Sequence, residues 1–150
     1  YNQISFSFDN LYMTSRLIEG QFPNYQGVIP PEFATHVTVD TAAFNAAVDR
    51  ISLISRSGVY NIIKLDFAEN QIHITSNNPE IGNAEEYIPA EIDGPDIAIA
   101  FNAQYIIDVL KIIDTKTCRI GLNQPLSPAS IQEAESDSFV YVVTPVRTNH

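Results

Sequence analysis

The chain has 150 residues, and 8 Lys and Arg against 18 Asp and Glu give it a formal net charge of −10. Hydrophobic residues make up 45% of the chain, which is typical of a globular domain and too apolar for a disordered tail. No apolar run approaches the ~20 residues that span a bilayer, and a single cysteine excludes a disulfide framework. The charge also argues against a free-standing nucleic-acid binder, which usually carries a basic patch.

The first element is a predicted hairpin. Residues 4–8 are apolar at every second position, residues 9–10 are a turn pair, and residues 11–18 form the return strand. A chain that begins inside a hairpin is typical of part of a longer protein. Residues 20–27 are rich in turn formers and two consecutive prolines follow, so we expect a domain boundary near residues 20–31.

A strand, a helix and three strands are predicted next. Residues 35–39 form a strand, and Asp40 or Thr41 can cap a helix that ends at Ser57-Gly58. Its apolar stripe has helical spacing: Phe44, Ala47, Val48 and Ile51. The strands that follow are residues 60–67, 71–75 and 85–92; Glu69-Asn70 joins the first two, and residues 77–79 precede the third.

The same pattern then repeats. Residues 97–101 form a strand, Asn102 caps a helix with the stripe Ile106, Val109, Leu110 and Ile113, and residues 117–122, 129–132 and 139–143 form strands. An offset of 61 relates Phe44 to Tyr105, Val48 to Val109, Ile51 to Ile112 and Arg50 to Lys111. We therefore predict an α+β domain of two β-α-β-β-β units, with both helices packed on one face of antiparallel sheets.

A search for catalytic motifs finds none, and neither a cofactor nor a metal site is predicted. The chain lacks nucleophile-elbow, zinc-protease, dinucleotide and P-loop motifs. His36 and His73 lie in predicted strands, with His73 facing solvent, and Cys118 follows no ligand spacing. An alternative to a non-catalytic function is a small acidic α+β enzyme that uses Cys118 or the carboxylates of residues 80–91.

Those carboxylates belong to Glu80, Glu85, Glu86 and Glu91. They could hold a cation, form a solvated face, or form an electrostatic edge for a basic partner. The residues alone leave these three interpretations open, and the resemblance that follows favours the third.

Four segments together resemble one family. Residues 14–25, TSRLIEGQFPNY, and the Val-Ile-Pro at 28–30 are similar to a segment of the bacterial replicative sliding clamp, the β subunit of DNA polymerase III. Residues 47–52, 99–110 and 141–147 resemble its third-domain helix, its strand–helix segment and its C-terminal tail. The resemblance covers essentially the whole chain, with the segments in the family's order.

The resemblance implies three similar domains per chain and two chains joined head to tail as a ring around duplex DNA. Residues 1–24 would be the last strands of the middle domain, and residues 25–150 the third domain. The implied role is a non-catalytic processivity factor of the bacterial cytoplasm and nucleoid, without a cofactor. Its ring tethers DNA polymerase, and polymerase, clamp-loader and repair proteins dock through short linear motifs. We expect this chain alone to be a monomer.

The resemblance also implies three sets of site residues. The peptide-binding groove would comprise Pro23, Val28, Tyr60, Asn102, Tyr105, Leu126, Pro128, Val142, Thr144, Pro145, Val146 and Arg147. The DNA-facing residues would be Arg50, Arg56, Lys111 and Lys116. The ring interface would comprise Leu53, Ile54, Glu80, Glu85 and Glu86. Gly27, Pro128 and Thr144 depart from residues common in the family, so peptide preference is open at those points.

Overall fold

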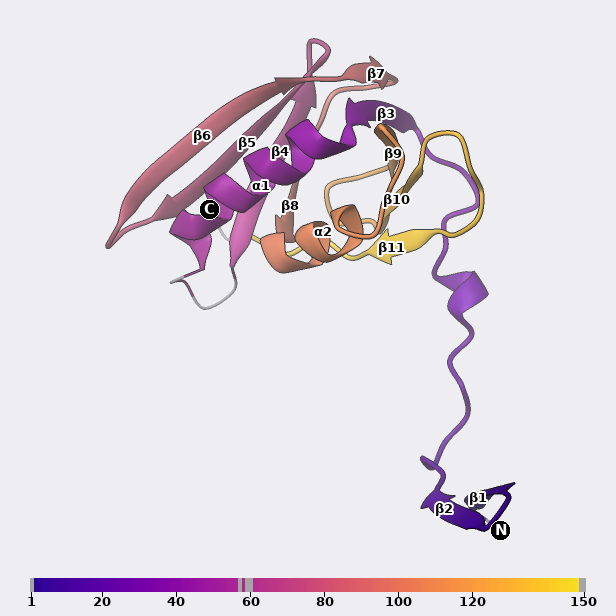
Figure 1. The fold of residues 1–150 in the computed structure, drawn as a ribbon. Coiled ribbons are helices and arrows are strands. Elements are labelled where there is room, and N and C mark those ends of the chain that lie inside the picture. Colours follow the sequence, from indigo (N-terminus) through magenta and orange to yellow (C-terminus); the bar gives the residue numbers. More distant parts are fainter. Residues whose placement is uncertain (1, 57, 59–60, 149–150) are drawn as a thin grey trace.

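The structure is a computed structural model, and it describes residues 2–56, 58 and 61–148. Its elements in chain order are β1 (Gln3–Phe8), β2 (Leu11–Arg16), η1 (Tyr25–Gly27), β3 (Thr35–Asp40), α1 (Thr41–Ser55), β4 (Ile62–Ala68), β5 (Gln71–Asn78), β6 (Gly82–Pro89), β7 (Glu91–Asp93), β8 (Ile97–Asn102), α2 (Ala103–Leu110), β9 (Thr117–Leu122), β10 (Ala129–Glu133) and β11 (Tyr141–Val143). Figure 1 shows an N-terminal hairpin set apart from a body of two sheets and two helices.

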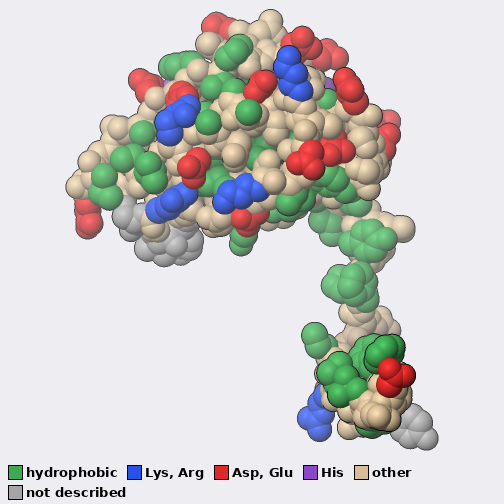
Figure 2. All heavy atoms as spheres, viewed as in Figure 1, with side chains coloured by type: hydrophobic (Ala, Val, Ile, Leu, Met, Phe, Trp, Pro, Cys, Tyr) green, Lys and Arg blue, Asp and Glu red, His purple; other side chains and the backbone are tan. Residues whose placement is uncertain are grey.

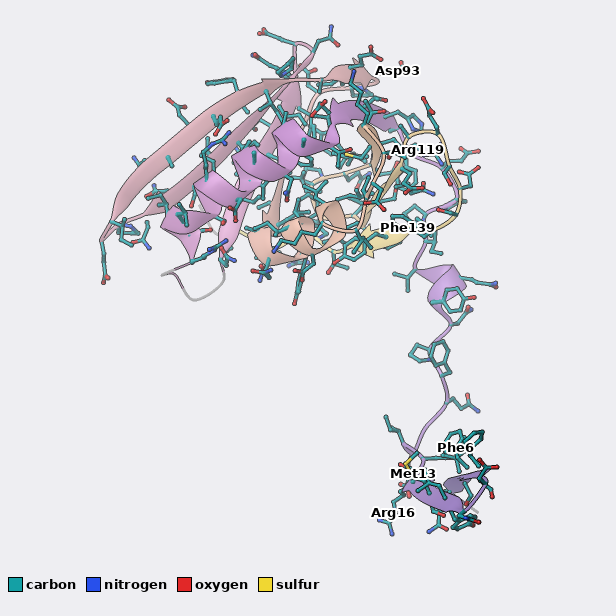
Figure 3. All side chains as sticks on the ribbon, viewed as in Figure 1. Phe6, Met13, Arg16, Asp93, Arg119 and Phe139 are labelled. Carbon is teal, nitrogen blue, oxygen red and sulfur yellow. The ribbon has the colours of Figure 1, made fainter. Side chains whose placement is uncertain are left out.

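The hairpin of β1 and β2 confirms the first predicted element. The two strands pair antiparallel, and Asp9 takes a positive φ of 47° in the two-residue turn. The return strand ends at Arg16 rather than at Ile18. Every residue from 2 to 28 is exposed, including apolar side chains such as Phe6 and Met13, which Figure 3 labels on the hairpin. No described residue of the body covers these side chains.

The body confirms the doubled unit through its strand order. One sheet has the order β11-β10-β9-β3-β7 and the other β6-β5-β4-β8, and every recorded pairing is antiparallel. The first strand of each unit, β3 or β8, pairs with the second strand of the other unit, β9 or β4. The two units therefore exchange their first strands, and four strands of each sheet correspond under a pseudo-twofold axis.

The helix starts also correspond. Asp40 accepts a hydrogen bond from the Ala43 amide at 2.8 Å, and Asn102 accepts one from the Gln104 amide at 2.9 Å. These N-cap bonds satisfy amides that have no partner within the helix. The caps lie 62 residues apart, so the predicted offset of 61 is wrong by one.

Burial supports the corrected offset. Tyr105 and Ile112, the predicted counterparts of the buried Phe44 and Ile51, are 51% and 61% exposed. An offset of 62 instead pairs buried residues throughout: Phe44 with Ile106, Ala47 with Val109, Val48 with Leu110 and Ile51 with Ile113. An offset of 61 also matches some apolar residues, because neighbouring positions on a helical stripe are both buried and a shift by one retains part of the pattern.

After the helices the offset falls to 55, because α1 has 15 residues and α2 has 8. Arg56 and Lys111 are the two C-cap residues, and their amides donate to Ser52 O and Ile107 O. Arg56 is therefore the counterpart of Lys111, and the predicted equivalence of Arg50 and Lys111 is wrong. Cations at both helix C-termini complement the helix dipoles.

One predicted strand divides into two. Residues 85–92 contribute to β6 and β7, which belong to different sheets. Asn70, whose φ is 55° in the β4–β5 turn, stabilises the crossing: its carbonyl accepts from the Ala90 amide at 2.9 Å, and its Oδ1 from the Ile92 amide at 3.2 Å. A local strand pattern cannot reveal a change of sheet that a distant turn imposes.

Smaller differences concern the ends of elements. β5 runs on to Asn78, so the break predicted at residues 77–79 falls after it. β4 begins at Ile62, and β11 begins at Tyr141 rather than at residue 139. Ser57 and Tyr60, predicted at a helix end and a strand start, lie outside the described residues.

Both helices lie on the same side of the sheets, as predicted (Figure 1). α1 packs on β4, β5 and β6, while α2 packs on β8 and on α1. Their buried faces join one core cluster that includes Phe44, Phe67 and Phe101. No helix among the described residues is long and apolar enough to cross a membrane.

Gly82 and Gly94 differ in how closely other residues pack around them. Gly82 and Gly94 have φ of 129° and 120°, but a Cβ at Gly82 meets nothing within 4 Å, whereas one at Gly94 lies 2.2 Å from the Ala34 carbonyl oxygen. We expect Gly82→Ala to lower the free energy of unfolding by about 1–3 kcal/mol through backbone strain. Gly94→Ala should lower the free energy of unfolding by about 1–3 kcal/mol more than Gly82→Ala, because the backbone at Ala34 and Thr35 must move. Urea denaturation measures both, and equal losses would contradict the packing described here.

Candidate functional site

The free edge of β8 and the C-terminal tail define one candidate site. β8 is the edge strand of the four-stranded sheet, and the tail after β11 runs beside it. The Val146 amide donates a hydrogen bond of 2.8 Å to the Ala100 carbonyl. This bond holds the tail next to a strand edge whose other polar groups are available for pairing.

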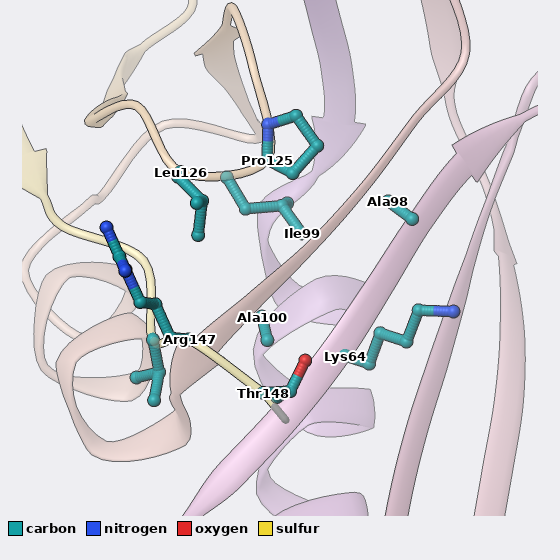
Figure 4. A pocket seen from close by; sticks show the side chains of 9 residues that line it. Lys64, Ala98, Ile99, Ala100, Pro125, Leu126, Arg147 and Thr148 are labelled. Carbon is teal, nitrogen blue, oxygen red and sulfur yellow. The ribbon is translucent and has the colours of Figure 1, made fainter. Parts of the chain in front are cut away.

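A cavity of about 440 Å³ lies between β8, the β9–β10 connection and the tail (Figure 4). It is lined by Lys64, Ala98, Ile99, Ala100, Pro125, Leu126, Val146, Arg147 and Thr148. Most of this lining is apolar, and its two charged side chains are both cationic, although the chain carries a net charge of −10. The cavity therefore suits an apolar group rather than a cation.

Three predicted groove residues, Leu126, Val146 and Arg147, line this cavity. The prediction missed Lys64 and the β8 residues of the lining. Lys64 lies at the cavity because it pairs with Ala100 of β8 across the sheet. Sequence could have suggested Pro125 as the neighbour of Leu126. The register between two strands 36 positions apart gives no local signal.

A second group of predicted groove residues lies at the start of α2. Asn102 caps the helix, and Tyr105 projects from it with 51% of its area exposed. Burial raises the pKa of the Tyr141 hydroxyl, and the nearby Asp108 and Tyr105 raise it further. Tyr105 therefore lies near enough to Tyr141 of β11 to act on it electrostatically.

The remaining predicted groove residues are more scattered. Val142, Pro145 and Pro128 are half-buried and Thr144 is exposed in and around β10 and β11. Pro23 and Val28 are exposed in the segment that leads to β3, and neither lines the cavity. Tyr60 lies outside the described residues.

The predicted DNA-facing side chains are all exposed, and Figure 2 shows Lys and Arg interspersed with Asp and Glu on the face that carries the helices. Arg50 pairs with Glu86 at 2.5 Å, and Arg56 pairs with Asp49 at 2.8 Å. Lys111 and Lys116 form no ion pair with any described residue. Two of the four cations are thus engaged within the chain.

At the predicted ring edge, Asn78 joins the end of α1 to the β5–β6 turn. Its Nδ2 donates to the Ile54 carbonyl at 3.4 Å, and its Oδ1 accepts from the Glu80 and Ile81 amides at 2.9 and 3.3 Å. Leu53, the residue before Ile54, is 60% exposed. Ile54 and its neighbour Leu53 are therefore brought together with Glu80.

Glu85 and Glu86 do not extend that edge as one acidic cluster. Successive residues of a strand face opposite sides, so Glu86 lies on the helical side and Glu85 on the outer side. Glu85 contacts His73 Nε2 at 2.9 Å, and the His73 ring stacks on Tyr87 at 4.1 Å. The His73 side chain is 25% exposed, so the prediction that it faces solvent holds only in part.

The structure offers no support for the enzyme alternative. Cys118 is fully buried, and burial raises the pKa of its thiol to about 11, which disfavours the thiolate that a nucleophile requires. Among the described residues, no group of three His, Cys, Asp or Glu side chains is placed to hold a metal ion.

These features define a doubled α+β domain with two helices on one side of its sheets. Residues 26–147 match the family described as DNA polymerase III beta subunit, C-terminal domain. The chain belongs to this family.

Individual relatives agree. The beta sliding clamp of Staphylococcus aureus is 32% identical over 148 residues, which are 98% of this chain and 39% of that protein. The DNA polymerase III subunit beta of Pseudomonas aeruginosa superposes with a TM-score of 0.88 at 33% identity, over 99% of this chain and 40% of that one. A Bartonella birtlesii sliding clamp bound to griselimycin superposes with a TM-score of 0.89 at 32% identity, over 98% of this chain and 39% of that one. The chain thus spans about two fifths of the length of these relatives.

Proposed function

We propose that this chain acts as the third domain of a bacterial sliding clamp, a ring that encloses duplex DNA and tethers DNA polymerase to it. The family match over residues 26–147 carries the proposal. Enclosure retains DNA without tight contact, so a net charge of −10 is compatible with it. The proposed role is non-catalytic, in the bacterial cytoplasm at the nucleoid.

We divide the chain into residues 1–24, the last strands of a middle domain, and residues 25–150, the third domain. The exposed hairpin supports this division, because its apolar side chains lack cover in the body of the chain. In the proposed arrangement, the rest of the middle domain covers them.

We assign partner docking to the groove formed by α2, the tail and the β9–β10 connection. An extended peptide with a glutamine and apolar side chains would lie there, its apolar groups against Leu126 and Val146 and its backbone near Tyr105. The cavity beside β8 and the exposed Tyr105 support this assignment. Polymerase, clamp-loader and repair proteins are the proposed partners.

We assign non-specific DNA contact to Arg50, Arg56, Lys111 and Lys116. The equivalent C-cap positions of Arg56 and Lys111 support this, because two cations at corresponding helix ends can meet phosphates in a similar way. Lys111 and Lys116 have no ion pair among the described residues to compete with a phosphate.

Tyr105→Ala should weaken binding of a fluorescein-labelled peptide that contains one glutamine and two leucines by about tenfold or more, because exposed aromatic anchors dominate such interfaces. Removal of residues 144–150 should also weaken it. Fluorescence anisotropy measures the affinity. Tyr87→Ala is the matched control, since Tyr87 is 54% exposed on the outer sheet face and Tyr105 is 51% exposed. Equal losses in the two tyrosine variants would contradict the assigned groove.

The ring-edge assignment predicts a monomer. Leu53, Ile54, Glu80, Glu85 and Glu86 are proposed to meet a different surface, the first domain of another chain, and such a head-to-tail contact needs both surfaces. Light scattering of the 150-residue chain should therefore give a mass near 16.7 kDa. A mass near twice that value would show that this chain pairs with itself.

A further inference from the structure

Arg50 and Glu86 belong to two surfaces that the proposed function treats separately, DNA contact and ring closure. The structure joins them. Arg50 Nη2 lies 2.5 Å from Glu86 Oε1, and Arg50 Nε donates to Glu86 Oε2 at 3.1 Å. Both carboxylate oxygens and two guanidinium nitrogens are thus engaged, in the bidentate geometry that a guanidinium can also offer to a phosphate.

Among the described residues, neighbouring charged side chains do not compete for the Arg50–Glu86 ion pair. Glu86 lies on the helical side of β6 and is 28% exposed, whereas Arg50 is 58% exposed. Arg56, the C-cap residue of α1, pairs with Asp49 instead. Glu85, the adjacent carboxylate, faces the outer side and contacts His73. Among the described residues, Glu86 is the single acidic ion-pair partner of Arg50.

We propose that Glu86 is a positioning residue that holds Arg50 away from DNA phosphate until a cation at the ring edge engages the carboxylate. The proposal rests on the assigned DNA and ring surfaces. A partner's cation that binds the Glu86 carboxylate would compete with Arg50 for its two oxygens and offset the negative charge that holds Arg50, so each contact weakens the other. Ring closure then frees Arg50, and by reciprocity a phosphate on Arg50 frees Glu86 for the partner.

The test replaces Glu86 by Gln, which keeps the side-chain shape and removes the charge as a bound cation would. Glu85→Gln is the matched control, because it makes the same change in net charge on the opposite face. Anisotropy with a labelled duplex of about 20 base pairs is followed in a salt series that starts near 10 mM, where screening is weak.

Glu86→Gln should raise affinity at the lowest salt about two- to fivefold over Glu85→Gln, in keeping with the modest strength of an exposed ion pair. Its plot of log affinity against log salt should steepen by about 0.9, the contribution of one added phosphate contact. The double variant Arg50→Gln/Glu86→Gln should lose both effects. A purely structural role of the pair would not change the slope.

The remaining outcomes distinguish the role of Glu86 from the DNA-contact surface. Identical slopes for Glu86→Gln and Glu85→Gln would overturn the role of Glu86; the DNA surface would stand if Lys111→Gln and Lys116→Gln still flatten the slope. Steepening that persists without Arg50 would overturn the inference as well. Absence of measurable binding in every variant at about 10 mM salt would overturn both the inference and the DNA surface.

Discussion

The exchange of first strands between the two units is the constraint on which the rest of the structure depends. β3 completes the sheet of the second unit through β9, and β8 completes that of the first through β4. Each helix then starts beside the opposite sheet. The Thr41 amide donates to Lys116 O at 2.9 Å, and the Ala103 amide donates to Asn61 O at 2.8 Å. Neither unit can close its sheet alone, so the two halves must form together.

This constraint also explains where the candidate surfaces lie. Because β8 ends the four-stranded sheet, its edge is free to receive the tail, and the cavity forms between them. β6 ends the same sheet on the other side and packs against α1, which brings Glu86 to Arg50. One sheet therefore has a peptide-binding edge and a subunit-binding edge in the proposed function.

Most elements could be predicted from the sequence because their signals are local. Asp40 and Asn102 are good caps followed by apolar stripes, and residues 69–70 are a two-residue turn. Features that depend on distant segments could not be predicted. The crossing at Ala90 depends on Asn70, the place of Lys64 in the cavity depends on its register with β8, and the Arg50–Glu86 pair depends on how α1 lies over β6. The motifs of the resemblance indicated which residues to examine, but not which of them lie together.

We propose that a partner peptide binds in the groove formed by α2, the tail and the β9–β10 connection, beside β8. Amide chemical-shift mapping by NMR, with the labelled chain and an unlabelled peptide containing one glutamine and two leucines, tests it most directly. We expect the largest shifts to cluster at Ala100, Tyr105, Leu126 and Val146. Shifts concentrated on β6 and the outer face around Tyr87, with those four amides unchanged, would contradict it.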